Sequence, residues 1–173
     1  MTGCAEPCPA EAFSRDPGVS PGPVENDETL CRGAFDPMHY DRKGVKIQPS
    51  VLRKRDLAQG QLSVYRESDR VSFSHDQVTD QIRRTGPSDQ VLKQILSARA
   101  SDVRAVRSPG VDGRSVCVRD DCDCDASGNK HHAHAHIALC ESAFPMPVDL
   151  ETEAFKQVHR DLVTLFKRVA RAA

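Results

Sequence analysis

The feature that most constrains the fold is an alternation of imidazole and aliphatic side chains over residues 131–140. The even-numbered positions carry His132, His134, His136 and Cys140, and the odd-numbered positions carry His131, Ala133, Ala135, Ile137 and Leu139. Successive side chains of a β-strand point to opposite faces. We therefore expect a strand whose mainly aliphatic face packs on the core, while its imidazoles face solvent, a cleft or a metal.

A long amphipathic helix is predicted at the C-terminal end. Its apolar positions recur with a period near 3.6, at Phe155, Val158, Leu162, Leu165, Phe166 and Val169. Asp149 is placed to cap its N-terminus. A membrane-surface or partner-binding helix is an alternative. Packing on a sheet is favoured because acidic and basic residues both occupy the polar face.

The remaining pattern predicts an α+β fold. Apolar or alternating segments predict strands over residues 30–35, 62–66, 103–106 and 115–119. Ser74 with Gln77 has the form of a capping box, and Ser88 precedes apolar residues at helical spacing, so two short helices are expected at 74–86 and 88–96. We expect a small, mostly antiparallel sheet covered by these two helices and the C-terminal one.

The chain of 173 residues suits one domain. Residues 1–27 contain five of the eleven prolines and predict a disordered leader, which leaves residues 28–173 as a single α+β domain. No apolar run approaches the roughly 20 residues that span a bilayer, and the first residues lack the pattern of a secretory signal. A cytoplasmic protein without a membrane partner is expected. Seven unevenly spaced cysteines then indicate reduced thiols or metal ligands.

A zinc-binding hairpin is one hypothesis for the Cys/His-rich segment. If the chain turns at residues 127–129, Cys122 and Cys124 approach His132 and His134, which gives a set of four zinc ligands. The neighbouring aspartates at 121, 123 and 125 would favour a cation. The alternative is an exposed His-rich hairpin without a physiological metal.

The leading functional hypothesis is a non-enzymatic binding or accessory protein. Glycine-rich phosphate loops and the GxSxG elbow are absent from the sequence. The formal net charge is -1, and the basic stretch at residues 42–55 has only Tyr40 near it for stacking, so a protein partner is favoured over nucleic acid. The expected contact surface is a cleft lined by Arg32, Ser63, His134 and His136.

Several short motifs together resemble a group of small, functionally uncharacterised bacterial proteins. The matching residues are Leu30, Arg32 and Gly33; Pro49 and Ser50; Leu62, Ser63 and Val64; and His134, Ala135 and His136. The resemblance covers roughly residues 29–140 and implies a shared organisation without a particular activity. The chain departs from the group in its Cys-Asp-Cys-Asp loop and in the additional His131 and His132.

The sequence also resembles the layout of ADP-ribosyltransferase-like enzymes, with an early Leu-x-Arg-Gly strand, a strand that contains Ser and Tyr, and a Glu on a late strand. The corresponding residues are Arg32, Tyr65 and Glu141. The resemblance implies an NAD-using enzyme in which the Arg anchors the NAD phosphates and the Glu orients the ribose. This is the third functional hypothesis.

Overall fold

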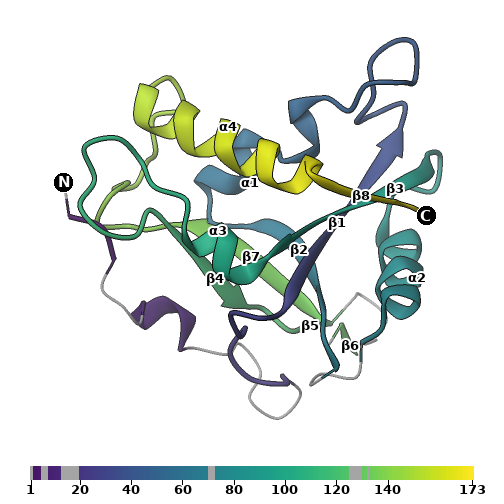
Figure 1. Ribbon diagram of the computed structural model, residues 1–173, viewed down its shortest axis with the longest axis horizontal. Coiled ribbons are helices and arrows are strands. Elements are labelled where there is room, and N and C mark those ends of the chain that lie inside the picture. Colours follow the sequence, from purple (N-terminus) through teal and green to yellow (C-terminus); the bar gives the residue numbers. More distant parts are fainter. Residues whose placement is uncertain (1, 5–7, 13–19, 70–72, 125–129, 132) are drawn as a thin grey trace.

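The computed structural model describes residues 2–4, 8–12, 20–69, 73–124, 130–131 and 133–173. Its centre is a six-stranded antiparallel sheet in the order β4-β7-β2-β1-β3-β8 (Figure 1). The strands are β1 (Thr29–Asp36), β2 (Leu62–Glu67), β3 (Val91–Arg99), β4 (Val116–Asp120), β7 (His134–Leu139) and β8 (Val169–Ala172), with a separate two-stranded ladder of β5 (Asp123–Cys124) and β6 (Lys130–His131). The helices are α1 (Lys54–Ala58), α2 (His75–Thr85), α3 (Ala100–Arg104) and α4 (Glu153–Lys167), with 3-10 turns η1 (Pro9–Glu11) and η2 (Pro49–Val51). The α+β prediction is confirmed.

The alternating segment forms β7, between β2 and β4. Ala135, Ile137 and Leu139 belong to the main hydrophobic core, and the partly exposed His136 points to the other face with His134. The predicted two-faced strand is therefore present over residues 134–139. His131 lies in β6 instead, and His132 falls outside the described residues.

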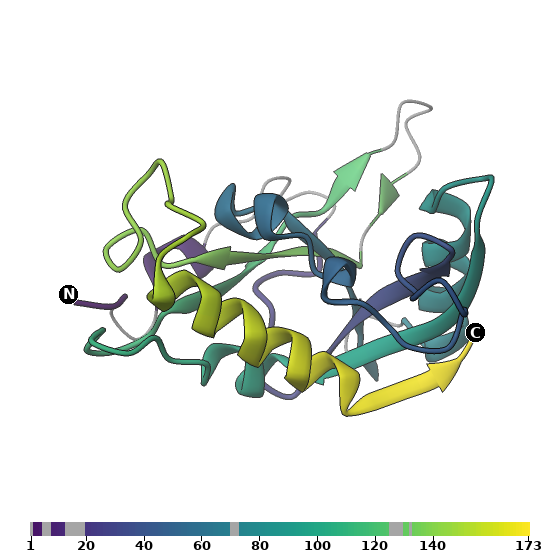
Figure 2. The same cartoon turned by 90° about the horizontal axis from the view of Figure 1, so that it is seen from above.

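Helix α4 covers one face of the sheet. Phe155, Val158, Leu162 and Phe166 are fully buried in the main core. The helix begins later than predicted, because the Thr152 hydroxyl, and not Asp149, accepts the capping hydrogen bond from the Phe155 amide at 3.3 Å. The chain continues from α4 directly into β8 at the edge of the sheet (Figure 2).

Helix α2 packs against a second, smaller core. Val78 and Ile82 of α2 contact Cys31, Phe35 and Ile95 of the sheet. The predicted capping box is formed at Ser74 and Gln77, and the helix ends before Gly86. Among the described residues, no helix has the length and apolar composition needed to cross a membrane.

Two local predictions are wrong. Residues 88–96 contain the start of β3, which pairs with β1 and β8, and residues 103–106 begin within α3. Short apolar runs fit helix and strand equally well, and pairing along the length of β1 decides the outcome for β3. Helix α1 was not predicted.

The described residues of the predicted leader pack against the domain. Cys8 and Val24 are buried, and so is the Glu11 carboxylate. Glu11 accepts hydrogen bonds from the Val118 amide at 2.7 Å, from Arg104 at 3.1 Å and from Arg114 at 3.0 Å. These parts of residues 1–27 are ordered on the surface of the sheet, contrary to a fully disordered leader.

A buried ionic network anchors the chain at the start of β1. The Arg66 guanidinium, 1% exposed, donates to both Glu28 carboxylate oxygens at 2.7 Å and to Asp120 Oδ1 at 2.9 Å. It also donates to the carbonyls of Gly22 and Pro23. Arg66 thus ties β2 to β4 and to the segment before β1.

Candidate functional site

The imidazole face of β7 continues onto β2. Ser63 lies opposite His136 and Tyr65 lies opposite His134 in the antiparallel register. Directly opposite residues project to the same face of a sheet. The structure therefore brings together three of the four residues that were predicted to form a contact surface, namely Ser63, His134 and His136.

Arg32, the fourth predicted residue, lies where β1 and β2 separate. The two strands pair from Thr29 to Cys31 of β1, and beyond this point the Arg32 side chain occupies the gap. Its Nη1 donates to the Ser63 carbonyl at 2.6 Å and its Nε to the Val51 carbonyl at 3.2 Å. Both acceptors are uncharged. Burial lowers the pKa of the Arg32 guanidinium, whereas the negative charge of Asp56 raises it. A guanidinium nevertheless stays protonated in proteins.

His39 places a second nitrogen donor beside Arg32. Its Nδ1 accepts a hydrogen bond from the Phe35 amide at 3.1 Å, so the neutral ring carries its hydrogen on Nε2. Nε2 is buried and meets no hydrogen-bond partner within the described part of the chain. Burial, together with the charges of Arg32 and Arg53, lowers the pKa of His39 to about 4, so the ring is neutral at pH 7.

These groups line a cavity of about 220 Å³, here called the Arg32 cavity. Its polar lining comes from Arg32, His39, Arg53, Ser63, Tyr65 and Thr85, and its apolar lining includes Phe35, Met38, Ile82 and Pro87. No carboxylate is among the described residues that line it. A buried, unsatisfied N–H beside two guanidinium groups creates an environment suited to an anion.

Ser63 connects the Arg32 cavity to the histidine strand. Its hydroxyl lies 2.6 Å from His134 Nε2, and His134 Nδ1 lies 2.8 Å from the Asp121 carbonyl oxygen. Because a carbonyl can only accept, Nδ1 of the neutral ring is the donor, and Nε2 then accepts the Ser63 proton. This is the pairing of hydroxyl and oriented base that serine nucleophiles use.

Asp121 also interacts with both histidines through its carboxylate. Oδ2 lies 3.0 Å from His136 Nδ1 and 3.6 Å from His134 Nδ1. Burial opposes ionisation of this carboxyl, but hydrogen bonds from His134 and His136 outweigh it and hold its pKa well below the usual range. Asp121, His134 and His136 each offer a ligand atom within 4.8 Å of the others, so this group could hold a metal ion.

The predicted zinc set is only partly located. Cys122 is buried and His134 lies in the sheet, whereas the Cys124 side chain and His132 fall outside what the structure describes. A second group with metal-ligand chemistry consists of Cys4, Cys8 and Cys117, whose ligand atoms also lie within 4.8 Å of one another. The spacing of Cys4 and Cys8 suits a metal, but Cys117 lies more than 100 residues further along the chain, so no third ligand was apparent from the sequence.

The cysteines are not all reduced, contrary to the prediction. Cys4 and Cys140 form a disulfide that links the N-terminal segment to the end of β7. Cys31 is a buried thiol whose Sγ donates to Glu67 Oε2 at 3.4 Å, and burial, followed by the charge of Glu67, raises the pKa of this thiol.

The residues expected from the ADP-ribosyltransferase resemblance are not all adjacent. Arg32 and Tyr65 line the Arg32 cavity together. Glu141 is exposed and follows β7 at the end where Leu139 pairs with Val116, and it lines a different cavity, with Cys4 and Cys117. His39, which the sequence reasoning missed, is the residue that completes the Arg32 cavity.

Comparison with known proteins adds no relative to this description. No protein-family model, no curated protein and no solved structure matches the chain.

Proposed function

We propose that this protein is a binding protein whose Arg32 cavity receives an anionic group, either free or carried by a partner. The observation that carries the proposal is the combination of the Arg32 guanidinium, hydrogen-bonded to two neutral carbonyls, with the unsatisfied His39 Nε2–H in the same cavity. A bound oxyanion would accept from the Arg32 guanidinium, and a small movement of the His39 ring would let the buried Nε2–H donate to it as well. Arg53, exposed at the mouth, adds a second positive charge.

Calorimetric titration with inorganic phosphate tests this proposal. Hydrogen bonds to charged groups contribute about 1.5–3 kcal/mol, so Arg32→Gln should weaken phosphate binding by roughly 10- to 150-fold. Arg53→Gln should weaken it less, because Arg53 is exposed. Arg55→Gln is the matched control, since Arg55 is equally exposed but does not line the cavity.

Arg32 is largely buried, so each variant is first checked for folding by circular dichroism and thermal unfolding. Folded wild-type protein that gives no phosphate-dependent heat would contradict the proposal, as would an equal loss in Arg53→Gln and Arg55→Gln. Titration with NAD in parallel tests the ADP-ribosyltransferase alternative. That alternative requires NAD to bind and Glu141→Gln to abolish turnover of the bound NAD.

A second candidate function is covalent catalysis by Ser63, favoured by its 2.6 Å contact with His134 Nε2. A fluorophosphonate probe tests it directly. Ser63 Oγ would attack phosphorus, its proton would pass to His134 Nε2, and fluoride would leave. Intact-mass measurement should then show one adduct on the wild type and none on Ser63→Ala. An unlabelled wild-type protein would exclude this candidate.

Zinc at Cys122, Cys124, His132 and His134 is the remaining proposal for the histidine strand. The proximity of Asp121, His134 and His136 supports a cation in this region. Both ring nitrogens of His134 already make close contacts, with Ser63 and with the Asp121 carbonyl, and a metal would have to displace one of them. Binding of an anion in the Arg32 cavity displaces neither of these His134 contacts.

A further inference from the structure

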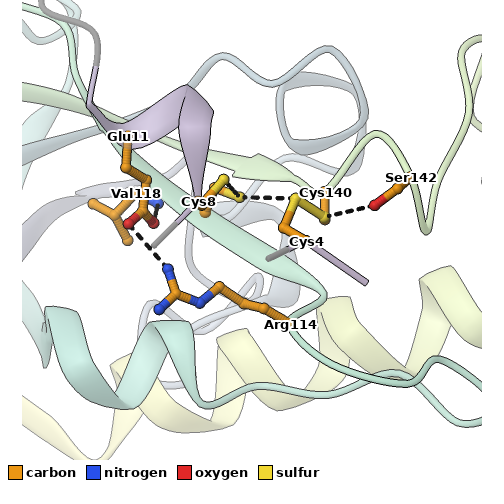
Figure 3. The surroundings of a disulfide bond; sticks show 8 residues. Cys4, Cys8, Glu11, Arg114, Val118, Cys140 and Ser142 are labelled. Carbon is orange, nitrogen blue, oxygen red and sulfur yellow. Dashed lines mark hydrogen bonds and ion pairs between the residues drawn. A yellow bond between two sulfur atoms is a disulfide. The ribbon is translucent and has the colours of Figure 1, made fainter. Parts of the chain in front are cut away.

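Four cysteines that are distant in the sequence meet at one end of the sheet. Cys4 lies in the N-terminal segment, Cys8 immediately precedes η1, Cys117 is on β4 and Cys140 follows β7. Cys8 Sγ is 2.7 Å from Cys117 Sγ, which is 3.6 Å from Cys4 Sγ, and Cys4 is bonded to Cys140. Figure 3 shows the sulfurs of Cys4, Cys8 and Cys140 gathered between the N-terminal segment and the sheet.

We propose that, when the Cys4–Cys140 disulfide is reduced, Cys4, Cys8, Cys117 and Cys140 bind one zinc ion as four thiolates. Zinc–sulfur bonds of about 2.3 Å in a tetrahedron place the sulfurs about 3.8 Å apart. The sulfurs of Cys4, Cys8 and Cys117 already lie within 4.8 Å of one another. Cys140 Sγ is bonded to Cys4 Sγ but does not belong to that group, so the Cys140 side chain has to move after reduction to reach the same spacing from all three sulfurs.

The surrounding charges suit a site that is negative overall. Four thiolates and one Zn²⁺ carry a net charge of about −2. The Arg114 charge favours the thiolate of Cys117, and Arg119 lines the adjoining cavity. Glu11 has the opposite effect, but its carboxylate accepts hydrogen bonds from Arg114 and the Val118 amide (Figure 3). It also accepts one from Arg104.

The backbone already holds the N-terminal ligands in place. Thr2 and Cys4 form β-bridges with Asp112 and Arg114, and the Cys4 amide donates to the Arg114 carbonyl at 3.0 Å. Gly3 permits this close approach, because a Cβ there would lie 2.6 Å from the Arg114 nitrogen. A cavity lined by Cys4, Cys8, Cys117 and Cys140 gives a reductant and the metal a path to the sulfurs.

Conversion between the two states balances with a dithiol as reductant. The Cys4–Cys140 bond accepts two electrons and two protons from the dithiol, which itself becomes a disulfide. The two thiols so formed, together with those of Cys8 and Cys117, then release four protons to solvent as they bind one Zn²⁺.

The test measures zinc in the full chain after reduction, addition of zinc alone and removal of unbound metal. We expect about one zinc per wild-type chain by elemental analysis, and far less in Cys8→Ser and Cys117→Ser. Cys31→Ala is the control, because Cys31 lies in the other core, under α2. His134→Ala should also retain zinc, which separates this site from the hairpin site at Cys122, Cys124, His132 and His134.

A measurement on the wild type protects the test against variants that do not fold. Cobalt(II) added to the reduced chain should produce the intense visible absorption of tetrahedral thiolate coordination, and zinc should displace it. A reduced, folded chain that takes up neither metal would overturn the proposal. Loss of the bound zinc in His134→Ala, with zinc retained in Cys117→Ser, would also overturn the proposal.

Discussion

Replacing Arg66 with Met should remove a large share of the stability of the fold. Arg66 is the cation that the buried carboxylates of Glu28 and Asp120 share, and their side chains are 1% and 0% exposed. Removing one member of a buried ion pair costs about 3–5 kcal/mol, because the partner charge stays buried without compensation. Two carboxylates lose the Arg66 charge here, although Asp120 keeps the Ser20 hydroxyl and Glu28 keeps the Glu25 amide, so we expect a loss of about 4 kcal/mol, against a total of roughly 5–15 kcal/mol for a domain.

Urea unfolding, followed by circular dichroism, measures this loss. With a slope of about 2 kcal/mol per molar urea, 4 kcal/mol corresponds to a midpoint lowered by about 2 M. Arg83→Met is the matched control, because Arg83 and its partner Asp80 are both more than half exposed and such pairs contribute less than about 1 kcal/mol. A loss below about 1 kcal/mol in Arg66→Met, at an unchanged slope, would refute the assigned role of the network.

Two further predictions concern residues that line the Arg32 cavity. The pKa of His39 is lowered from 6.5 to about 4, so the unfolded chain binds a proton more readily than the folded one, and stability should fall as the pH is lowered from about 6.5 through 4. Urea unfolding at a series of pH values should show a weaker pH dependence of stability in His39→Gln than in the wild type. An identical dependence would contradict the assignment to His39. Gly33→Ala should destabilise the folded protein by about 1–3 kcal/mol, because the added Cβ would lie 2.5 Å from Ile82 Cγ2 and 2.8 Å from Phe35 Cε2. An unchanged midpoint of thermal unfolding would show that α2 moves aside at no cost.

The periodic elements of this fold could be predicted from the sequence. The two-residue repeat of β7 and the 3.6-residue repeat of α4 each persist long enough to exclude the other type of structure. Residues 91–96 are too short for such a decision, because two apolar pairs on either side of Lys93 and Gln94 fit a helix as well as a strand. Their pairing with β1, a contact between distant parts of the chain, makes them a strand.

The candidate site was predictable only where it lies on regular strands. Ser63, His134 and His136 share a face because of strand alternation, which the sequence displays. His39 follows β1 in a loop, and its approach to Arg32 depends on the path of that loop. The only feature of the sequence that pointed to His39 was the Asp36-Pro37 turn, which Met38, His39 and Tyr40 follow.

The buried ionic and sulfur clusters could not be predicted for a similar reason. Glu11 meets Arg104 and Arg114, and Cys4 meets Cys140, across more than 90 residues of sequence. The proline-rich composition near the N-terminus suggested disorder, but specific long-range partners compensate for the small amount of apolar surface there.

Diffraction from crystals soaked in tungstate, a tetrahedral oxyanion with a strong anomalous signal, shows whether the Arg32 cavity binds an anion. We expect an anomalous peak within hydrogen-bonding distance of the Arg32 guanidinium and His39 Nε2, and no such peak in Arg32→Gln. An empty cavity, with tungstate bound only along the basic stretch at residues 42–55, would contradict it.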